Sequence, residues 1–491
     1  MDKYENKKEL TGKILFLISF AGLGLMIYLL FAKPFLSIDE WFTNGLVKLG
    51  FMNIISLTSA DVHPPLYYFI VKAVLKVFML LNIPFNEVIL VKFISLIPYI
   101  VLLGFSLTKI RKEYGWYAGG LFAFTVLAMA NFLTFYLTAR MYSWGLLFIV
   151  ISFIYALDIL NKPSLKYWVL LSVFSVLGAY CFYATAITSI CIYLFLLLHI
   201  IFEDRSELKN FIISCALNVI LYLPWLFTLI NQVSGVHKSY WIKTPTVESS
   251  ITSFASAFPS FGFAIACIFS VIILVVGAFA AKRYYENHES DDYYILSGVF
   301  VFIATVVLSI IVSLLFKPIL LPRILVPAAG IFWLAFSILM SKFTFNKSMI
   351  LVTLLILVIG CAGIANQYSE ISDTYDKTVE IQNLLDDMNN NNTIVIFDMM
   401  TKYVRFFDEL NETQQFYKFT IDNKTYRPDY ITTLNLPNYN FKFNEDVAEN
   451  SDKDIYFIVD KNSKIELPDD LNTTQVGELK NCIFIKVNSA S

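Results

Sequence analysis

Two adjacent carboxylates, Asp39 and Glu40, follow the first long apolar stretch of the chain. A carboxylate close to an acceptor hydroxyl can take up its proton as a general base, so either residue could activate an attacking alcohol. The surrounding sequence, S-I-D-E-W, also fits a capping box in which Ser37 caps a helix and Glu40 reaches back to it. The two interpretations are compatible, because a capped helix holds the neighbouring carboxylate in place.

A second polar segment, D-V-H-P-P-L at residues 61–66, precedes an aromatic-rich helix. Proline at the start of a helix and aspartate in the turn before it are both common. Asp61 and His63 nevertheless place two ionisable groups in one short connection, at the depth expected for a lipid headgroup. They are therefore candidates for shaping a polar pocket at the membrane surface.

Two arginines, Arg140 and Arg323, lie at ends of apolar stretches that are expected to face outward. A guanidinium group binds two phosphate oxygens at once, so both residues are candidates for contacting a lipid phosphate. The alternative is that each arginine only anchors its helix at the membrane surface.

Two carboxylates and a histidine near one loop permit a divalent cation but do not require one, so no metal site is predicted and the cofactor is unknown.

The composition indicates that these residues belong to a polytopic membrane protein. Of 491 residues, 57% are apolar and 15% are charged, whereas soluble domains are about half apolar and about a quarter charged. A transmembrane helix needs about 20 apolar residues. The apolar stretches of suitable length number about eleven, at 14–32, 89–108, 116–135, 144–160, 167–185, 186–202, 210–228, 259–281, 294–316, 324–341 and 349–366.

A twelfth apolar stretch, residues 66–81, is not counted as a span. Lys72 and Lys76 are four residues apart and so share one face of a helix. Two lysines in mid-span would cost roughly 2.5–3.5 kcal/mol each. A helix with a basic face and aromatic residues at its start fits better in the membrane interface, with its lysines at lipid headgroups.

The distribution of charge supports this count and predicts an orientation. If residues 66–81 lie flat and the N-terminus is cytoplasmic, five basic connections fall inside, as the positive-inside rule requires. They are 109–112, 161–166, 205–209, 282–283 and 342–347. The long first loop (33–88) and the C-terminal tail then lie outside the cytoplasm.

The tail differs from the rest of the chain in charge. Residues 368–491 carry 22 acidic and 12 basic residues, so the net charge of −2 leaves +8 for residues 1–367. Apolar runs at 393–397, 454–459 and 482–487 predict buried strands, and residues 376–388 predict a helix. We therefore expect a transmembrane domain at 1–367 and a small extracytoplasmic α/β domain at 368–491. No basic stripe accompanies a binding module, so nucleic acid is not an expected partner.

Several motifs, in order along residues 14–370, resemble the GT-C glycosyltransferases. The similarity is to the bacterial and archaeal relatives of the dolichyl-phosphate-mannose protein mannosyltransferases and to the lipid A aminoarabinose transferases. The acidic pair at 39–40 followed by D-x-H-P-P-L is its most specific part. The others are A-R-M-Y-S at 139–143, Y-L-P-W-L at 222–226 with N-Q at 231–232 and Y-W-I at 240–242, and the segment from K-P to P-R at 317–323.

The resemblance implies an α-helical GT-C-like fold and a hexosyl or pentosyl transferase of the cell membrane. Its donor would be a sugar on a polyprenyl phosphate, and its acceptor (protein, lipid or glycan) would receive the sugar on the extracytoplasmic face. Asp39 would be the general base. The implied catalytic residues are Asp39, Glu40, Asp61 and His63, and the implied residues for the substrate or lipid phosphate are Lys92, Arg140, Tyr142, Tyr240, Trp241 and Arg323.

Two other functions fit a protein with many spans. A transporter or flippase of lipid-linked sugars would be expected to have internal repeats, broken helices and ionisable groups near the bilayer midplane. Here the candidate groups lie at outer helix ends, and no repeat is visible. A sensor that binds a ligand through its tail would not need the motifs of the outer loops. The sequence therefore favours the transferase.

Overall fold

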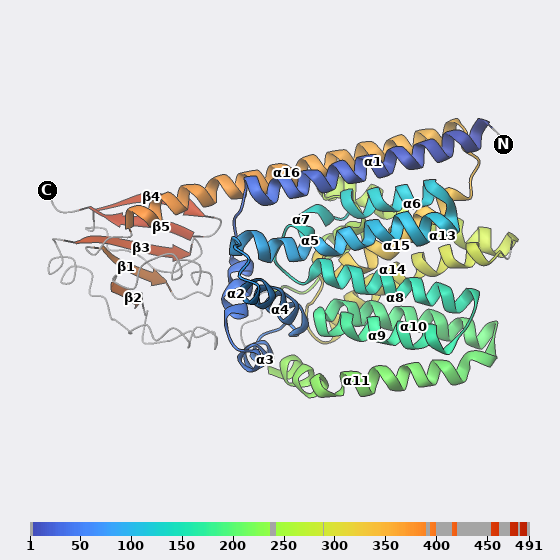
Figure 1. Cartoon of the computed structure of the whole chain (residues 1–491), viewed down its shortest axis with the longest axis horizontal. Helices are drawn as coiled ribbons and strands as arrows, with labels where there is room; N and C mark the ends of the chain where they lie inside the picture. Colours follow the sequence, from blue (N-terminus) through green and yellow to red (C-terminus); the bar gives the residue numbers. More distant parts are fainter. Residues whose placement is uncertain are drawn as a thin grey trace. The chain divides into compact units, whose positions relative to one another are not determined.

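The computed structural model of the chain describes residues 3–235, 242–287, 289–388, 393–398, 415–419, 453–460, 472–479 and 482–488 (Figure 1). It divides into two compact units, which we call the helical unit and the sheet unit. The helical unit consists of Met1–Ala32 and Val47–Tyr368, and the sheet unit consists of Lys33–Leu46 and Ser369–Ser491.

Sixteen α-helices occur in the part of the chain that the structure describes, and most belong to the helical unit. They are α1 (Lys3–Ala32), α2 (Ile38–Lys48), α3 (Phe51–Ala60), α4 (Leu66–Leu80), α5 (Glu87–Phe105), α6 (Arg111–Ala128), α7 (Phe132–Tyr136), α8 (Tyr142–Asn161), α9 (Leu165–Cys181), α10 (Tyr183–Phe202), α11 (Leu208–Gly235), α12 (Val247–Phe254), α13 (Phe263–Asn287), α14 (Ser290–Leu315), α15 (Val326–Ser341) and α16 (Lys347–Met388). A π-helical turn, η1 (Ser106–Ile110), and three 3₁₀ turns, η2 (Arg205–Glu207), η3 (Ala255–Ala257) and η4 (Pro322–Leu325), connect some of them.

Nine helical segments in the described part of the chain are long and apolar enough to cross a membrane. One of them, Glu87–Ala128, covers parts of two predicted spans and is interrupted at Gly115, which has a φ of 87°. Only glycine adopts this conformation without steric cost. The apolar helix Leu165–Cys181 falls just below the length limit. The chain is therefore a multi-pass membrane protein with nine candidate spans among the described residues, against about eleven predicted.

One predicted span, residues 116–135, has a different end in the structure. Helix α6 stops at Ala128, and Ala130 and Asn131 both have positive φ (50° and 55°) before α7 begins. Asparagine tolerates this left-handed conformation better than most residues. The apolar sequence runs on across the break, so hydropathy alone does not show it.

Helix α15 lies in the core of the helical unit. All of its residues from Val326 to Met340 are buried, as expected for a helix that is apolar around its whole circumference. Close packing elsewhere depends on small residues: a Cβ atom added at Gly120 of α6 would lie 2.2 Å from the carbonyl oxygen of Gly12 in α1. Two backbones approach this closely only where side chains are absent.

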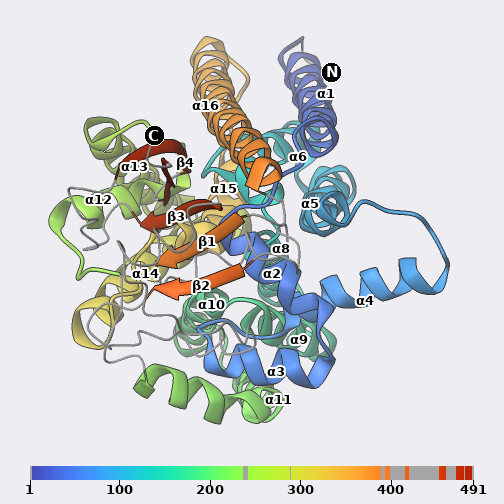
Figure 2. The same ribbon diagram turned by 90° about the vertical axis from the view of Figure 1, so that its left-hand side faces the viewer.

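Helix α4 has 15 residues and is not among the candidate spans. Its C-terminal half extends away from the other helices of the unit, and a connection returns from its end to α5 (Figure 2). The tip exposes Met79, Leu80 and Leu81, which suits a helix lying in the interface. Lys76 is exposed, but Lys72 is buried and donates to the carbonyl oxygen of Val47 at 3.0 Å. The expected headgroup contact is therefore wrong for Lys72.

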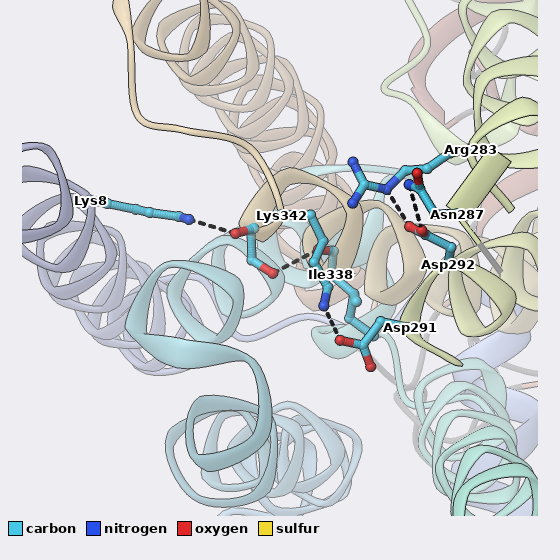
Figure 3. Close-up of polar contacts among 8 residues, drawn as sticks. Lys8, Arg283, Asn287, Asp291, Asp292, Ile338 and Lys342 are labelled. Carbon is cyan, nitrogen blue, oxygen red and sulfur yellow. Dashed lines mark hydrogen bonds and ion pairs between the residues drawn. The ribbon is translucent and has the colours of Figure 1, made fainter. Parts of the chain in front are cut away.

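Ion pairs join helix ends that the sequence analysis predicts to be cytoplasmic (Figure 3). Lys342 after α15 pairs with Asp291 of α14, and Arg283 of α13 pairs with the fully buried side chain of Asp292. The Nζ atom of Lys8 in α1 donates to the carbonyl oxygen of Ser341 at 2.5 Å. We call these contacts the inner clasp. They join α1, α13, α14 and α15.

The sheet unit contains a mixed sheet of five strands in the order β2-β1-β3-β5-β4. The strands are β1 (Thr393–Asp398), β2 (Gln415–Phe419), β3 (Asp454–Asp460), β4 (Thr473–Leu479) and β5 (Cys482–Val487). Strand β1 is parallel to β2 and β3, while β5 is antiparallel to β3 and β4. The predicted strands at 393–397, 454–459 and 482–487 are confirmed, and residues 376–388 are helical within α16.

Candidate functional site

The acidic pair lies in the part of α2 that belongs to the sheet unit. The Glu40 carboxylate is buried and accepts a hydrogen bond from the backbone N–H of Ser37 at 2.8 Å. This is the reciprocal half of a capping box, so Glu40 serves the helix start. Asp39 is exposed on the same turn. The geometry gives the two neighbouring carboxylates different surroundings, and Asp39 is the one accessible from solvent.

The D-x-H-P-P segment connects α3 to α4 within the helical unit. Asp61 takes an extended conformation at the end of α3, where its N–H donates to the carbonyl oxygen of Leu57 at 3.1 Å. Two prolines follow His63 and donate no backbone hydrogen bond. Helix α4 then begins, and the Phe69 N–H donates to the carbonyl oxygen of Pro65.

His63 lies close to the two predicted arginines. Burial lowers the pKa of its imidazole well below the ordinary value, and the positive charges of Arg140 and Arg323 lower the pKa further. The three residues come from separate connections: the one before α4, the one before α8, and the turn η4. The fold therefore brings together two cations and a neutral imidazole that are far apart in the sequence. We call this group the cationic cluster.

Arg140 is 4% exposed, and its Nη1 atom donates to the Tyr68 hydroxyl at 3.3 Å. Both Tyr67 and Tyr68 of α4 are fully buried, and their rings are 5.7 Å apart. A snorkelling arginine would extend its guanidinium into water. Burial next to a tyrosine contradicts simple anchoring for Arg140.

Lys92 and Tyr142 lie on the helices next to this group. Lys92 is buried in the first turns of α5, three residues before Ser95, whose hydroxyl contacts the Tyr67 hydroxyl at 2.9 Å. Residues three apart share a helix face, so Lys92 faces the side of α5 that meets α4. Tyr142 begins α8 two residues after Arg140 and packs edge-on against Phe182 at 5.4 Å.

A chain of hydrogen bonds joins the end of α3, just before the D-x-H-P-P segment, to α10 and α11, and no sequence pattern predicted it. Gln232 donates to the carbonyl oxygens of Thr58 and Ser59, and Tyr183 donates to Gln232. Asp61 is near enough to Tyr183 for its charge to act on the phenol. Gln232 belongs to the N-Q pair of the resemblance, but no role could be assigned to it from its type alone.

Lys317 is a further residue without an assigned role in the sequence analysis. Its Nζ atom is buried and has no hydrogen-bond partner among the described residues. It lies in the same connection as Arg323, which folds back on the end of α14 because Ser313 Oγ accepts from the N–H groups of Ile319 and Leu320 at 3.0 Å each. A buried ammonium group without a partner is costly, so it is a candidate for binding an anion.

Three other features of the chain contribute no residue to the cationic cluster: the Tyr240–Trp241 pair, possible metal ligands and an apolar groove. Tyr240 and Trp241 lie outside the described residues. Among the residues that are described, no group of three histidines, cysteines or acids could hold a metal ion. A groove of about 530 Å³ lies between α12, α13 and α14. Its walls are almost entirely apolar and include none of the predicted site residues, so it is not part of the candidate site.

Comparison with known proteins gives a likeness of fold. No family model matches the sequence, and no curated protein matches it. The crystal structure of ArnT from Cupriavidus metallidurans bound to undecaprenyl phosphate is similar to the chain, with a TM-score of 0.58 and 9% identity over 96% of this chain and 97% of that one. The apo structure of the same protein has a TM-score of 0.46 and 9% identity over 97% and 98%. The GT-C fold predicted from the motifs is thereby confirmed.

Proposed function

Starting from this fold, we propose that the protein is a glycosyltransferase that moves a sugar from a polyprenyl-phosphate donor to an acceptor on the extracytoplasmic face. The observation that carries the proposal is the cationic cluster, in which the charges of Arg140 and Arg323 both act on His63 and Arg140 is itself buried. Two arginines gathered at one place are suited to a phosphate. The similar ArnT structure contains undecaprenyl phosphate, which is the kind of lipid carrier proposed here.

The cations have two tasks in this reaction. They bind the donor phosphate, and they stabilise the negative charge that grows on it as the sugar leaves. Arg140 and Arg323 supply this charge, and Lys317 of the same connection as Arg323 supplies more. His63 stays neutral at pH 7 because its pKa is low. It can therefore donate or accept a hydrogen bond without adding a third charge of its own.

Transfer itself exchanges one carbon–oxygen bond for another. The acceptor hydroxyl attacks the anomeric carbon of the sugar, the bond from that carbon to the phosphate oxygen breaks, and polyprenyl phosphate leaves as the anion. The proton of the hydroxyl goes to Asp39, the exposed carboxylate of the pair. Glu40 keeps its hydrogen bond to Ser37 and holds the turn that presents Asp39.

The proposed orientation places the N-terminus in the cytoplasm and the C-terminal α/β domain outside. It is supported by the five basic connections, which all fall on one side when α4 is not counted as a span. The motif-bearing connections then share the outer side with Asp39. Membrane lipids and a lipid-linked sugar are the expected partners.

The test is transfer from radiolabelled polyprenyl-phosphate sugars in membranes that contain the intact protein or Asp39→Asn. We expect label to reach an acceptor with the intact protein and a loss of at least about 100-fold with Asp39→Asn, within the usual range for a general base. Asp376→Asn is a matched control, because Asp376 is an exposed carboxylate of the same unit that pairs with Lys33 at 3.5 Å. Donor that changes leaflet without losing its sugar would refute the transferase and favour a flippase.

A further inference from the structure

Gln232 lies near the end of α11 and has a buried side chain, 9% exposed. Its Nε2 atom donates to the carbonyl oxygen of Thr58 at 2.8 Å and to that of Ser59 at 3.2 Å. Both carbonyls belong to the last turn of α3, where an α-helix leaves its carbonyl groups without partners in the helix. Gln232 therefore caps the end of α3 from a helix that is distant in the sequence.

The other end of the amide is held as firmly. The Tyr183 hydroxyl donates to Oε1 of Gln232 at 2.5 Å, and Nε1 of Trp225 donates to the Tyr183 oxygen at 2.7 Å. An indole nitrogen can only donate, so the tyrosine proton must go to Gln232. Turning the amide over would aim its oxygen at two carbonyl oxygens. The hydrogen bonds thus run in one direction only, from Trp225 through Tyr183 and Gln232 to α3.

The residues that follow α3 are those of the D-x-H-P-P segment. Asp61 is the C-cap of α3, and its backbone N–H is bonded to Leu57 inside that helix. His63 follows two residues later, before two prolines that cannot donate backbone hydrogen bonds. The positions of the Asp61 and His63 side chains therefore depend on the position of the last turn of α3. Asp61 is also near the other end of the chain of hydrogen bonds, since its charge acts on Tyr183.

We propose that Gln232 is a positioning residue: by binding the end of α3 to Tyr183 and Trp225, it fixes Asp61 and His63 relative to the outer ends of α10 and α11. This inference rests on the proposed function for its effect on sugar transfer, although the positioning itself does not. Gln232 acts through α3 and is given no contact with substrate. A small shift of the D-x-H-P-P segment would misplace His63 relative to Arg140 and Arg323.

The decisive variants are Gln232→Glu and Gln232→Met, which have nearly the same shape. Both lose the donor groups that hold Thr58 and Ser59, and ionised glutamate also repels these carbonyls and Asp61. A misplacement of about 1 Å can lower a rate about 100-fold. We expect kcat to fall roughly 10- to 100-fold in both variants, while KM for the donor changes less than about threefold because the arginines remain in place.

The pH profile separates positioning by hydrogen bonds from mere packing. A protonated glutamic acid regains one O–H donor, so the activity of Gln232→Glu relative to the wild type rises as the pH falls. Gln232→Met shows no such recovery. The control is Tyr180→Phe, which removes a hydrogen bond to the carbonyl oxygen of Leu221 (3.1 Å) between α9 and α11 without involving α3. We expect it to leave kcat unchanged.

Amide hydrogen exchange of the peptide spanning residues 51–63 gives a measure that does not need enzyme activity. Exchange in the last turn of α3 accelerates in Gln232→Met and stays at the wild-type rate in Tyr180→Phe. Equal exchange in all three proteins overturns the proposed positioning. If the exchange result holds but the wild-type protein transfers no sugar, the proposed function fails and the positioning stands. Wild-type kcat in Gln232→Met overturns the link to catalysis.

Discussion

Replacing Lys317 by methionine tests whether a residue is kept for function at the expense of stability. Its Nζ atom is buried and has no hydrogen-bond partner among the described residues. An unsatisfied buried polar group costs about 1–3 kcal/mol, and a charged one costs more. Methionine has a similar length and an apolar end that tolerates irregular surroundings. Without donor present, we therefore expect Lys317→Met to raise the free energy of unfolding by about 1–3 kcal/mol.

The same substitution should weaken donor binding. A hydrogen bond between an ammonium group and phosphate contributes about 1.5–3 kcal/mol, which corresponds to a roughly 10- to 150-fold loss of affinity. The assay measures thermal unfolding of the purified protein in lipid nanodiscs, with and without a polyprenyl-phosphate sugar, together with transfer. The donor should raise the melting temperature of the wild type more than that of the variant.

Lys282→Met is the control for this experiment. Lys282 is an exposed lysine of α13 that pairs with Glu286 at 3.7 Å, and such surface pairs contribute little. We expect its stability and transfer to stay near the wild-type values. A Lys317→Met protein that is less stable than the wild type, or that transfers sugar at the wild-type rate, would contradict the assignment of Lys317 to an anion.

Three further predictions follow from the structure. When the pH is lowered from 8 to 5, His63→Gln should lose less stability than the wild type, as measured by thermal unfolding. The pKa of His63 is low in the folded protein, so the wild type loses stability as the pH falls below about 6.5, the pKa of histidine in the unfolded chain. Gly120→Ala should destabilise the helical unit by about 1–3 kcal/mol or prevent folding, because the new Cβ atom would meet the backbone of α1. The measurement is the fraction of monodisperse protein after solubilisation. Gly24→Ala is the control, because no atom lies within 4 Å of a Cβ added there. Asp292→Asn should cost about 3–5 kcal/mol by leaving Arg283 without its buried partner, and an unchanged melting temperature would show that the inner clasp is not needed.

The membrane part of the fold could be predicted because its physical cause is local. Apolar runs of sufficient length are visible in the sequence, and two lysines on one face were enough to exclude residues 66–81 as a span. The break after Ala128 was missed because it lies inside an apolar run and depends on two residues with positive φ. Strands β2 and β4 were missed because their sequences, Q-F-Y-K-F and T-T-Q-V-G-E-L, lack a continuous apolar run.

The candidate site was predictable in its parts and not in its arrangement. Residue types and motifs selected Asp61, His63, Arg140 and Arg323. No local pattern shows that three connections meet, because that depends on how the helices pack. For the same reason, the burial of Lys72 against Val47 and the contact of Gln232 with α3 could not be foreseen. Each of these contacts joins residues that are more than one helix apart along the chain.

The inner clasp also bears on how the protein is made. In the proposed orientation, Lys342 and Arg283 lie on the cytoplasmic side. Before the helices have packed, these cations have not yet met Asp291 and Asp292, and unpaired cations of this kind favour cytoplasmic loops. After assembly, the same residues are ion-paired and join neighbouring helices. In the proposed orientation, one set of charges therefore has two roles: it orients the nascent spans, and after assembly it joins neighbouring helices. A substitution there can fail in biosynthesis even where the finished protein would tolerate it.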